Sequence, residues 1–232
     1  MIQMKVAFVL RLINDFSGKC IKEKGFTFKI NDRIAKPVVK DEGVYVFLEP
    51  MEPKTKVTIE SVFYHSCSVW IDKRSLNPEE PVAEVRMYEK AGKRISKNAG
   101  VLTGMYEKGK TYPVEICAKK SSSLGLTLRE YRNIEGEHWF LLSGFTKEVL
   151  LGKTWMIDDP ENPVIVILQE KRGINEYRAE LISGDPEKVR SGTPIFRVYR
   201  SVTDRQGGYA IPVDGGEETK ILEVFSLHEN KI

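Results

Sequence analysis

The chain has 232 residues, of which 41% are hydrophobic and 30% are charged. This length suits one or two domains with a sizeable core. The formal net charge of +3 is too small to indicate nucleic-acid binding through overall charge, and no apolar run approaches the ~20 residues that a membrane span needs.

The first predicted element is a strand over residues 6–13. Its apolar composition resembles that of a signal peptide, but Arg11 interrupts the run and no small-residue cleavage site follows. Apolar residues recur every second position on one face, which is the period of a strand: Val6, Phe8, Leu10 and Leu12. We therefore expect a first strand of the mature fold and a cytoplasmic protein.

The three cysteines are widely spaced and odd in number, unlike the dense, even set of a secreted disulfide scaffold. We expect reduced thiols, with Cys67 and Cys117 in the core and Cys20 able to reach solvent.

Further strands are predicted over residues 26–30, 57–64 and 69–71, with Ser17-Gly18, Asn31-Asp32 and Asp41-Glu42-Gly43 among the turn signals between them. Short strands at this spacing are typical of a β-sandwich.

Residues 77–110 are predicted to connect two domains. Two prolines in Asn77-Pro78-Glu79-Glu80-Pro81 remove backbone donors and favour extended chain. The stretch 86–120 then has nine Lys and Arg residues against three Glu, and its glycines indicate loops or a mobile arm more than core. The expected domains are residues 1–76, a basic connector over 77–110, and residues 111–232.

The C-terminal half again has strand patterns, and the expected fold class is all-β. The predicted strands are residues 112–118, 126–132, 138–142, 164–169, 177–182, 194–202, 208–213 and 220–227. The stretch VIVIL at 164–168 is apolar on both faces and predicts a central strand. One turn of helix is expected after Asp185, which would cap it, with Pro186 at its first position.

An acidic turn followed by glycine and tyrosine occurs twice, in VKDEGVYVFLEP at 39–50 and in VTDRQGGYAIPV at 202–213. Aspartate accepts hydrogen bonds from turn backbone, glycine permits positive φ, and tyrosine buries its ring while its hydroxyl stays near water or a partner. The cassette is therefore predicted to shape hairpins and to have no chemical role.

Residues 6–72 resemble the carboxypeptidase-regulatory-like, or transthyretin-like, β-sandwich modules. The resemblance covers the first third of the chain and rests on Asp15, Ser17, Gly18, Asp41, Gly43, Tyr45, Phe47, Ser61 and Tyr64. The second cassette, around Asp204 and Tyr209, keeps only the core of the motif. The resemblance implies a transthyretin-like or immunoglobulin-like sandwich with an auxiliary role, and it extends to module-bearing proteins of phage-tail-like or contractile injection clusters.

Motifs that would indicate catalysis or metal binding are incomplete. Leu151-Gly152-Lys153-Thr154 resembles the end of a phosphate loop, but Lys147 stands where the first glycine is needed, so a hairpin turn is expected. His65 and Cys67 are two of the three or four ligands that zinc requires. Residues 158–163 are rich in carboxylates but lack the EF-hand pattern, and a turn before the strand at Val164 is preferred.

We predict no enzyme, no catalytic residue, no cofactor and no metal, since no histidine has an evident nucleophile partner. A hydrolase would need a pocket that joins His65 or His138 to a carboxylate and a serine or cysteine.

The basic segment contains the candidate partner-binding residues: Arg86, Lys90, Lys93, Arg94, Lys97, Lys108 and Lys110. These cations could bind an acidic protein surface or a nucleic-acid backbone. Alternatively, they are solvated and protect sheet edges from pairing with other strands. We expect a non-enzymatic structural or adaptor protein with protein partners in a larger assembly. The alternative is a glycan- or nucleic-acid-binding module; exposure of Trp70, Trp139 or Trp155 would favour glycan, and steep salt dependence would favour nucleic acid.

Overall fold

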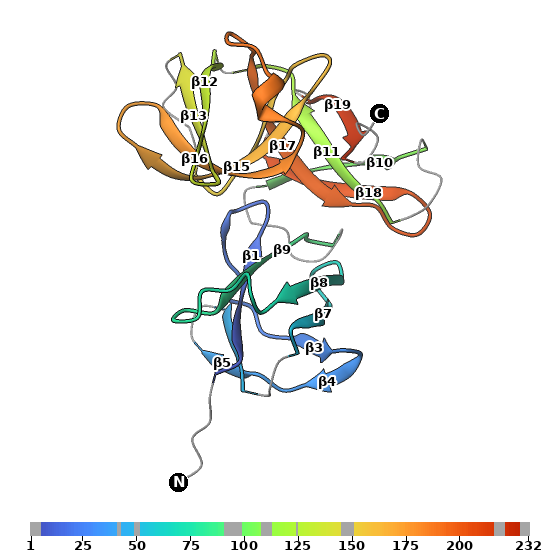
Figure 1. Cartoon of the computed structure of the whole chain (residues 1–232). Coiled ribbons are helices and arrows are strands. Elements are labelled where there is room, and N and C mark those ends of the chain that lie inside the picture. The colour runs from blue at the N-terminus through green and yellow to red at the C-terminus, as the bar shows by residue number, and fades with distance from the viewer. Residues whose placement is uncertain are drawn as a thin grey trace. The chain divides into compact units, whose positions relative to one another are not determined.

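The computed structural model describes residues 6–40, 43–48, 52–90, 99–107, 113–123, 125–144, 151–215 and 221–227. The chain forms two compact units, Met1–Arg94 and Ile95–Ile232 (Figure 1). Strands make up nearly all of the regular structure described in both units, which confirms the all-β prediction. In the described ranges, no helix has the length and apolar character needed to cross a membrane.

The first unit contains two sheets. Its strands are β1 (Phe8–Asn14), β2 (Lys19–Cys20), β3 (Phe26–Ile30), β4 (Arg33–Ala35), β5 (Val38–Lys40), β6 (Val44–Phe47), β7 (Lys54–Ser61), β8 (Cys67–Asp72) and β9 (Val82–Met87). One sheet has the order β2-β1-β6-β5, with β9 parallel to β1, and the other has the order β4-β3-β7-β8.

The core of the first unit is built from alternate residues of both sheets. Phe8 stacks on Phe47 within the first sheet, with ring centroids 4.5 Å apart, and Phe28 from β3 lies 5.6 Å from the Phe47 ring. Tyr45 of the first cassette is buried against Phe28 at 4.5 Å. Since these rings come from both sheets and share one cluster, the unit is a β-sandwich, as the alternation predicted.

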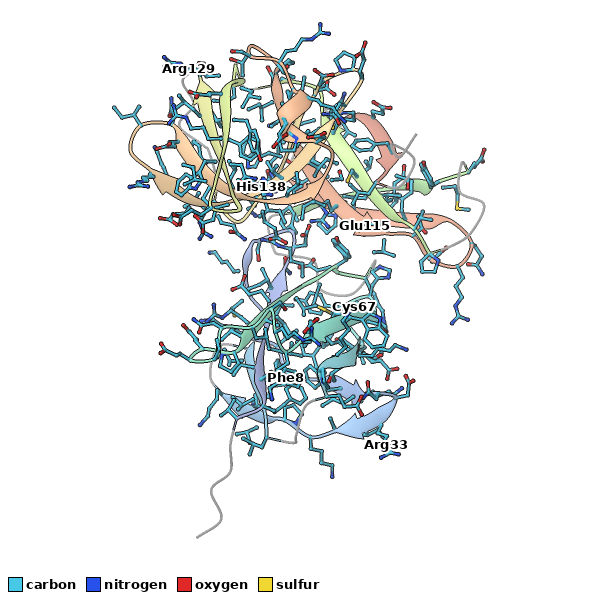
Figure 2. The ribbon with its side chains drawn as sticks, viewed as in Figure 1. Phe8, Arg33, Cys67, Glu115, Arg129 and His138 are labelled. Atoms are coloured by element: carbon cyan, nitrogen blue, oxygen red, sulfur yellow. The ribbon has the colours of Figure 1, made fainter. Side chains whose placement is uncertain are left out.

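Turn residues set the hairpins of the first unit. Asn31 and Asp32 join β3 to β4, and both have positive φ, 47° and 65°. Two such residues form the type of two-residue turn that matches the twist of a hairpin, and Asn and Asp tolerate this backbone conformation. Arg33, at the start of β4, is labelled beside this hairpin in Figure 2.

Residues 77–110 were predicted to form a connector between two domains. In the structure this stretch contributes one strand to each unit, β9 to the first and β10 (Ala99–Met105) to the second. β9 pairs in parallel with β1, from Val9↔Val82 to Asn14↔Met87, and Val85 and Met87 are buried. The predicted first domain, residues 1–76, therefore leaves out β9, which is the last strand of the first unit. A parallel partner about seventy residues away leaves no hairpin signal in the local sequence.

The second unit contains an eight-stranded sheet and a two-stranded sheet. Its strands are β10 (Ala99–Met105), β11 (Glu115–Lys120), β12 (Thr127–Ile134), β13 (Glu137–Ser143), β14 (Thr154–Ile157), β15 (Val164–Arg172), β16 (Glu176–Ser183), β17 (Ile195–Val202), β18 (Gly208–Asp214) and β19 (Ile221–Ser226). The large sheet has the order β12-β13-β16-β15-β14-β17-β11-β19, and β10 pairs with β18.

Six strands of the large sheet close on themselves. Leu128 on β12 donates its backbone N–H to Thr193 at 2.8 Å and accepts from Gly192 at 2.7 Å, just before β17. The backbone N–H of Ile195 also donates to Leu126. These bonds join the first strand of the sheet to the sixth, so β12, β13, β16, β15, β14 and β17 form a small barrel filled by apolar side chains such as Phe140, Trp155 and Leu168.

Local predictions in this half are confirmed. The five residues of VIVIL are buried in β15, which is the fourth strand of the sheet. A 3-10 helix spans Pro186–Lys188, and the side chain of Asp185 accepts a hydrogen bond from the backbone N–H of Glu187.

Candidate functional site

The candidate partner-binding residues fall partly within the described chain. Arg86 lies on β9 and its Nη1 is 3.6 Å from Asp15 Oδ1, while Lys90 donates from Nζ to the Ser61 carbonyl at 2.7 Å. Both cations therefore make contacts within the first sandwich. The remaining five candidates, Lys93, Arg94, Lys97, Lys108 and Lys110, lie outside the described residues.

The middle of the basic segment is β10, a strand at a sheet edge. It pairs with β18 over seven positions, from Ala99↔Asp214 to Met105↔Gly208. In the described part of the chain no strand pairs with its other side. Met105 is 59% exposed at the end of this strand, immediately before the cations at 108 and 110. A strand edge that no described strand covers thus lies, in the sequence, between two basic stretches.

The outer face of the β4-β3-β7-β8 sheet carries an exposed tryptophan. Val57 and Ile59 on β7 and Ile71 on β8 point into the core, so the alternate residues of these strands face solvent. Trp70 lies on this outer face with 70% of its surface exposed. Lys56 is its direct cross-strand partner. Figure 2 labels Cys67 on β8, the strand that also carries Trp70.

The outer face of this sheet also has separate polar side-chain pairs. Thr58 Oγ1 and Ser68 Oγ share a hydrogen bond of 2.9 Å across β7 and β8. Lys29 Nζ on β3 bonds to Glu60 Oε1 at 2.6 Å. Lys56 Nζ lies 3.5 Å from Asp32 Oδ1. We call Lys29, Asp32, Lys56, Thr58, Glu60, Ser68 and Trp70 the Trp70 face.

A small cavity in the first unit is lined by Glu23, Phe63, Tyr64 and Glu89. Glu89 is 7% exposed, and Asn14 Nδ2 donates to its Oε1 at 2.5 Å and to the Tyr64 hydroxyl at 3.3 Å. Burial raises the pKa of Tyr64 to about 12; the Asn14 hydrogen bond opposes this shift, and the carboxylates of Glu23 and Glu89 add to it. With a volume of about 30 Å³, the cavity has room for about two water molecules and not for a metabolite.

The described part of the turn cassettes has an architectural role. Asp204 accepts hydrogen bonds from the backbone N–H groups of Gln206 and Gly208, both at 2.8 Å, and Gly207 has a φ of 89°. In the first cassette Gly43 has a φ of 71° between the paired strands β5 and β6. Asp41 lies outside the described residues. The prediction of turns is confirmed at both glycines.

The stretch that resembles a phosphate loop and the carboxylate-rich stretch at 158–163 both form turns. Leu151 and Gly152 form a turn, Gly152 N donates to the Leu168 carbonyl at 2.6 Å, and a strand follows at Thr154. Asp159 Oδ1 accepts from the backbone N–H groups of Glu161 and Asn162 in the turn before β15.

The histidines and cysteines named above have these contacts. The backbone N–H of His65 donates to the Tyr88 carbonyl at 2.8 Å. Cys67 Sγ lies 3.5 Å from Met87 Sδ, and His138 Nδ1 lies 2.8 Å from the Tyr131 hydroxyl. Cys117 is buried, and Cys20 and Cys67 are partly buried. In the residues that the structure describes, no group of three or more His, Cys, Asp or Glu side chains is placed to hold a metal.

Sequence reasoning missed the buried pair of Asn14 and Glu89, because their 75-residue separation leaves no local pattern. It named Trp70 but gave no means to tell which face of β8 the second sheet would cover. Comparison of the chain with protein-family models, with curated proteins and with solved structures gives no match.

Proposed function

We propose that this protein is a non-enzymatic adaptor that docks on protein partners through the edge of β10. The observation that supports the proposal is that β10 has a free side in the described chain and lies between basic stretches of the sequence. Arg86 and Lys90, two of the candidate partner-binding residues, have contacts within the first unit. The proposed docking element is therefore the edge of β10 with the cations that flank it in the sequence.

Strand addition is the binding mode that suits this element. An edge strand offers unpaired backbone N–H and C=O groups that an extended segment of another protein can satisfy. Lysines that flank β10 in the sequence favour acidic residues in that segment and accelerate the encounter. The partner is therefore an extended, acidic stretch of another protein.

The resemblance of residues 6–72 to transthyretin-like modules extends the proposal to a larger setting. Module-bearing proteins of this kind occur in phage-tail-like and contractile injection clusters, and we place the adaptor in such a particle, assembled in the cytoplasm. The genes beside its own test this part of the proposal: sheath and tube genes support it, and their absence contradicts it.

A photo-crosslinking residue at position 105 tests the docking edge. Met105 ends β10, whereas Ile174, which is 88% exposed between β15 and β16, provides a matched position in the same unit. We expect a discrete crosslinked partner from the native lysate with the probe at 105 and not at 174. Equal crosslinking at both positions, or a monodisperse monomer without any partner, contradicts the proposal.

Charge reversal tests the contribution of the flanking cations. Replacing Lys93, Arg94, Lys97, Lys108 and Lys110 with glutamate is expected to abolish the crosslink at 105. The control replaces five cations of the first unit with glutamate: Lys24, Lys36, Lys40, Lys73 and Arg74. If a single-stranded oligonucleotide displaces the partner and binds with steep salt dependence, the segment is a nucleic-acid site instead.

A further inference from the structure

The exposure of Trp70 needs an explanation that the adaptor role does not supply. All three tryptophans lie in the described residues, and Trp139 and Trp155 are buried. A tryptophan side chain contributes one of the largest apolar surfaces available to a core. Trp70 instead leaves 70% of its surface in solvent, on a regular strand where the alternating residues Val69 and Ile71 pack inward.

Two hydroxyl groups lie beside Trp70 on the Trp70 face. Lys56 stands directly opposite Trp70 across the β7–β8 ladder, and Ser68 and Thr58 form the next outward pair along the same two strands. Outward residues on one strand are about 6.6 Å apart, because each residue advances the strand by about 3.3 Å. An aromatic ring and a pair of hydroxyls therefore lie side by side on one sheet face.

The hydroxyl pair retains hydrogen-bonding capacity. Each hydroxyl has one donor and two acceptor positions, and the bond of 2.9 Å between Thr58 and Ser68 uses one donor and one acceptor. One donor and three acceptors remain for a ligand, because two hydroxyls start with two donors and four acceptors. A sugar, whose hydroxyls both donate and accept, matches this mixture.

The charges on the face are neutralised locally. Lys29 is paired with Glu60 at 2.6 Å, and Lys56 with Asp32 at 3.5 Å. Lys54 and Asp72, the adjacent outward cross-strand pair, also have opposite charges. Three cations and three carboxylates sum to zero, so this face has no excess of positive charge with which to hold a polyanion. The electrostatic match is to an uncharged ligand.

We propose that the Trp70 face binds a neutral oligosaccharide, with one sugar ring stacked on the Trp70 indole and a neighbouring sugar bonded to Thr58 and Ser68. Stacking covers the apolar face of a sugar with the indole ring, while the indole N–H remains available as a donor. Trp70 and Ser68 are both exposed, so the face is open to one side of an extended chain of sugars.

Titration with uncharged hexasaccharides tests the inference on the full chain. The probes are cellohexaose, N-acetylchitohexaose, maltohexaose and laminarihexaose, with a heparin hexasaccharide as the charged comparison. Tryptophan fluorescence and calorimetry measure binding. We expect at least one neutral sugar to bind and to perturb the fluorescence of Trp70, because the other two indoles are buried.

Substitutions identify the binding surface. Trp70→Ala is expected to weaken binding at least about tenfold, Trp70→Phe less because a flat ring remains, and the double variant Thr58→Val/Ser68→Ala about fivefold. Ile174→Ala, at an exposed apolar residue of the second unit, is expected to leave the affinity unchanged. Since Trp70 is exposed, the melting temperatures of its variants should stay close to that of the parent.

The proposal is overturned if no neutral hexasaccharide binds, if Trp70→Ala binds as tightly as the parent, or if heparin alone binds and is released by salt. A protein partner crosslinked at position 70 would also overturn it, because the face would then be occupied by protein. None of these results bears on the crosslink at 105, so the adaptor proposal stands or falls independently.

Discussion

The carbonyl oxygen of Ile21 lies where a side chain on Gly43 would begin. A Cβ at residue 43 would be 1.8 Å from this oxygen, and Gly43 has a φ of 71°. Ile21 is itself held by a backbone hydrogen bond from its N–H to Leu12 at 2.8 Å. The glycine of the first cassette thus permits both its own turn and the close approach of the chain that follows β2.

Gly43→Ala is therefore expected to lower the free energy of unfolding by about 3–5 kcal/mol, because a backbone clash adds to the strain of positive φ. Gly25→Ala is the matched control, since Gly25 has a φ of 101° but open space around its Cβ position. Its cost should be about 1 kcal/mol from strain alone. Urea unfolding of both variants measures the difference; equal costs would show that the contact with Ile21 has no role.

The second prediction concerns alkaline pH and Tyr64. Its pKa in the folded protein is about 12, above the ordinary value of 10.0. The neutral phenol is therefore favoured by folding, and this stability is fully present below about pH 10 and is lost as the pH rises towards 12. Two pKa units correspond to about 2–3 kcal/mol.

Tyr64→Phe supplies the comparison for this prediction. The variant should be less stable at neutral pH, because it lacks the hydroxyl that accepts from Asn14. Its stability should then fall less steeply than that of the parent between about pH 10 and 12. Urea unfolding at a series of pH values measures both slopes, and parallel slopes would contradict the assignment to Tyr64.

The third prediction is the order in which the thiols react. Burial raises the pKa of Cys67 to about 11, so at pH 8 its thiolate fraction is roughly a hundredfold lower than that of a thiol with the ordinary value of 9.0. Cys117 is buried. In native protein, iodoacetamide should modify Cys20 first, Cys67 slowly and Cys117 last. Mass spectrometry of the peptides gives the order, and the three rates should converge in urea.

The fourth prediction concerns Arg197, which is buried at the start of β17. Its Nη1 donates to the carbonyls of Thr154 and Val198, both at 2.6 Å, and its guanidinium lies 4.8 Å from the Tyr199 ring centroid. Lysine lacks the planar group that stacks while it donates. Arg197→Lys should therefore lower the free energy of unfolding by about 2–4 kcal/mol.

Arg178→Lys is the control for Arg197. Arg178 makes its ion pairs with Glu137 and Glu170 at the surface of the same unit, at 3.3 and 3.1 Å. Surface pairs of this kind contribute about 0–1 kcal/mol, so little change is expected. Thermal unfolding of the two variants measures this difference. Comparable losses of stability in both would indicate that burial does not determine the effect of replacing arginine with lysine.

Local patterns in the sequence were sufficient to predict many elements. Five consecutive apolar residues from Val164 predicted a strand buried on both faces, and Asp185 followed by Pro186 predicted a capped turn of helix. Asp204 with Gly207 predicted a turn. Each of these signals lies within a few residues, where hydrogen bonds and backbone preferences act without help from the rest of the chain.

Contacts distant in sequence decided the remainder. β9 joins β1 through parallel pairing, Glu89 meets Asn14 within the first unit, and the start of β12 bonds to residues 192–195 to close the barrel. Alternation along β8 established that Trp70 and Ile71 face opposite ways, but not which of them would be covered. Only the packing of the second sheet against one side of β8 left Trp70 in solvent, because burial depends on what the chain brings to a face and not on the strand itself.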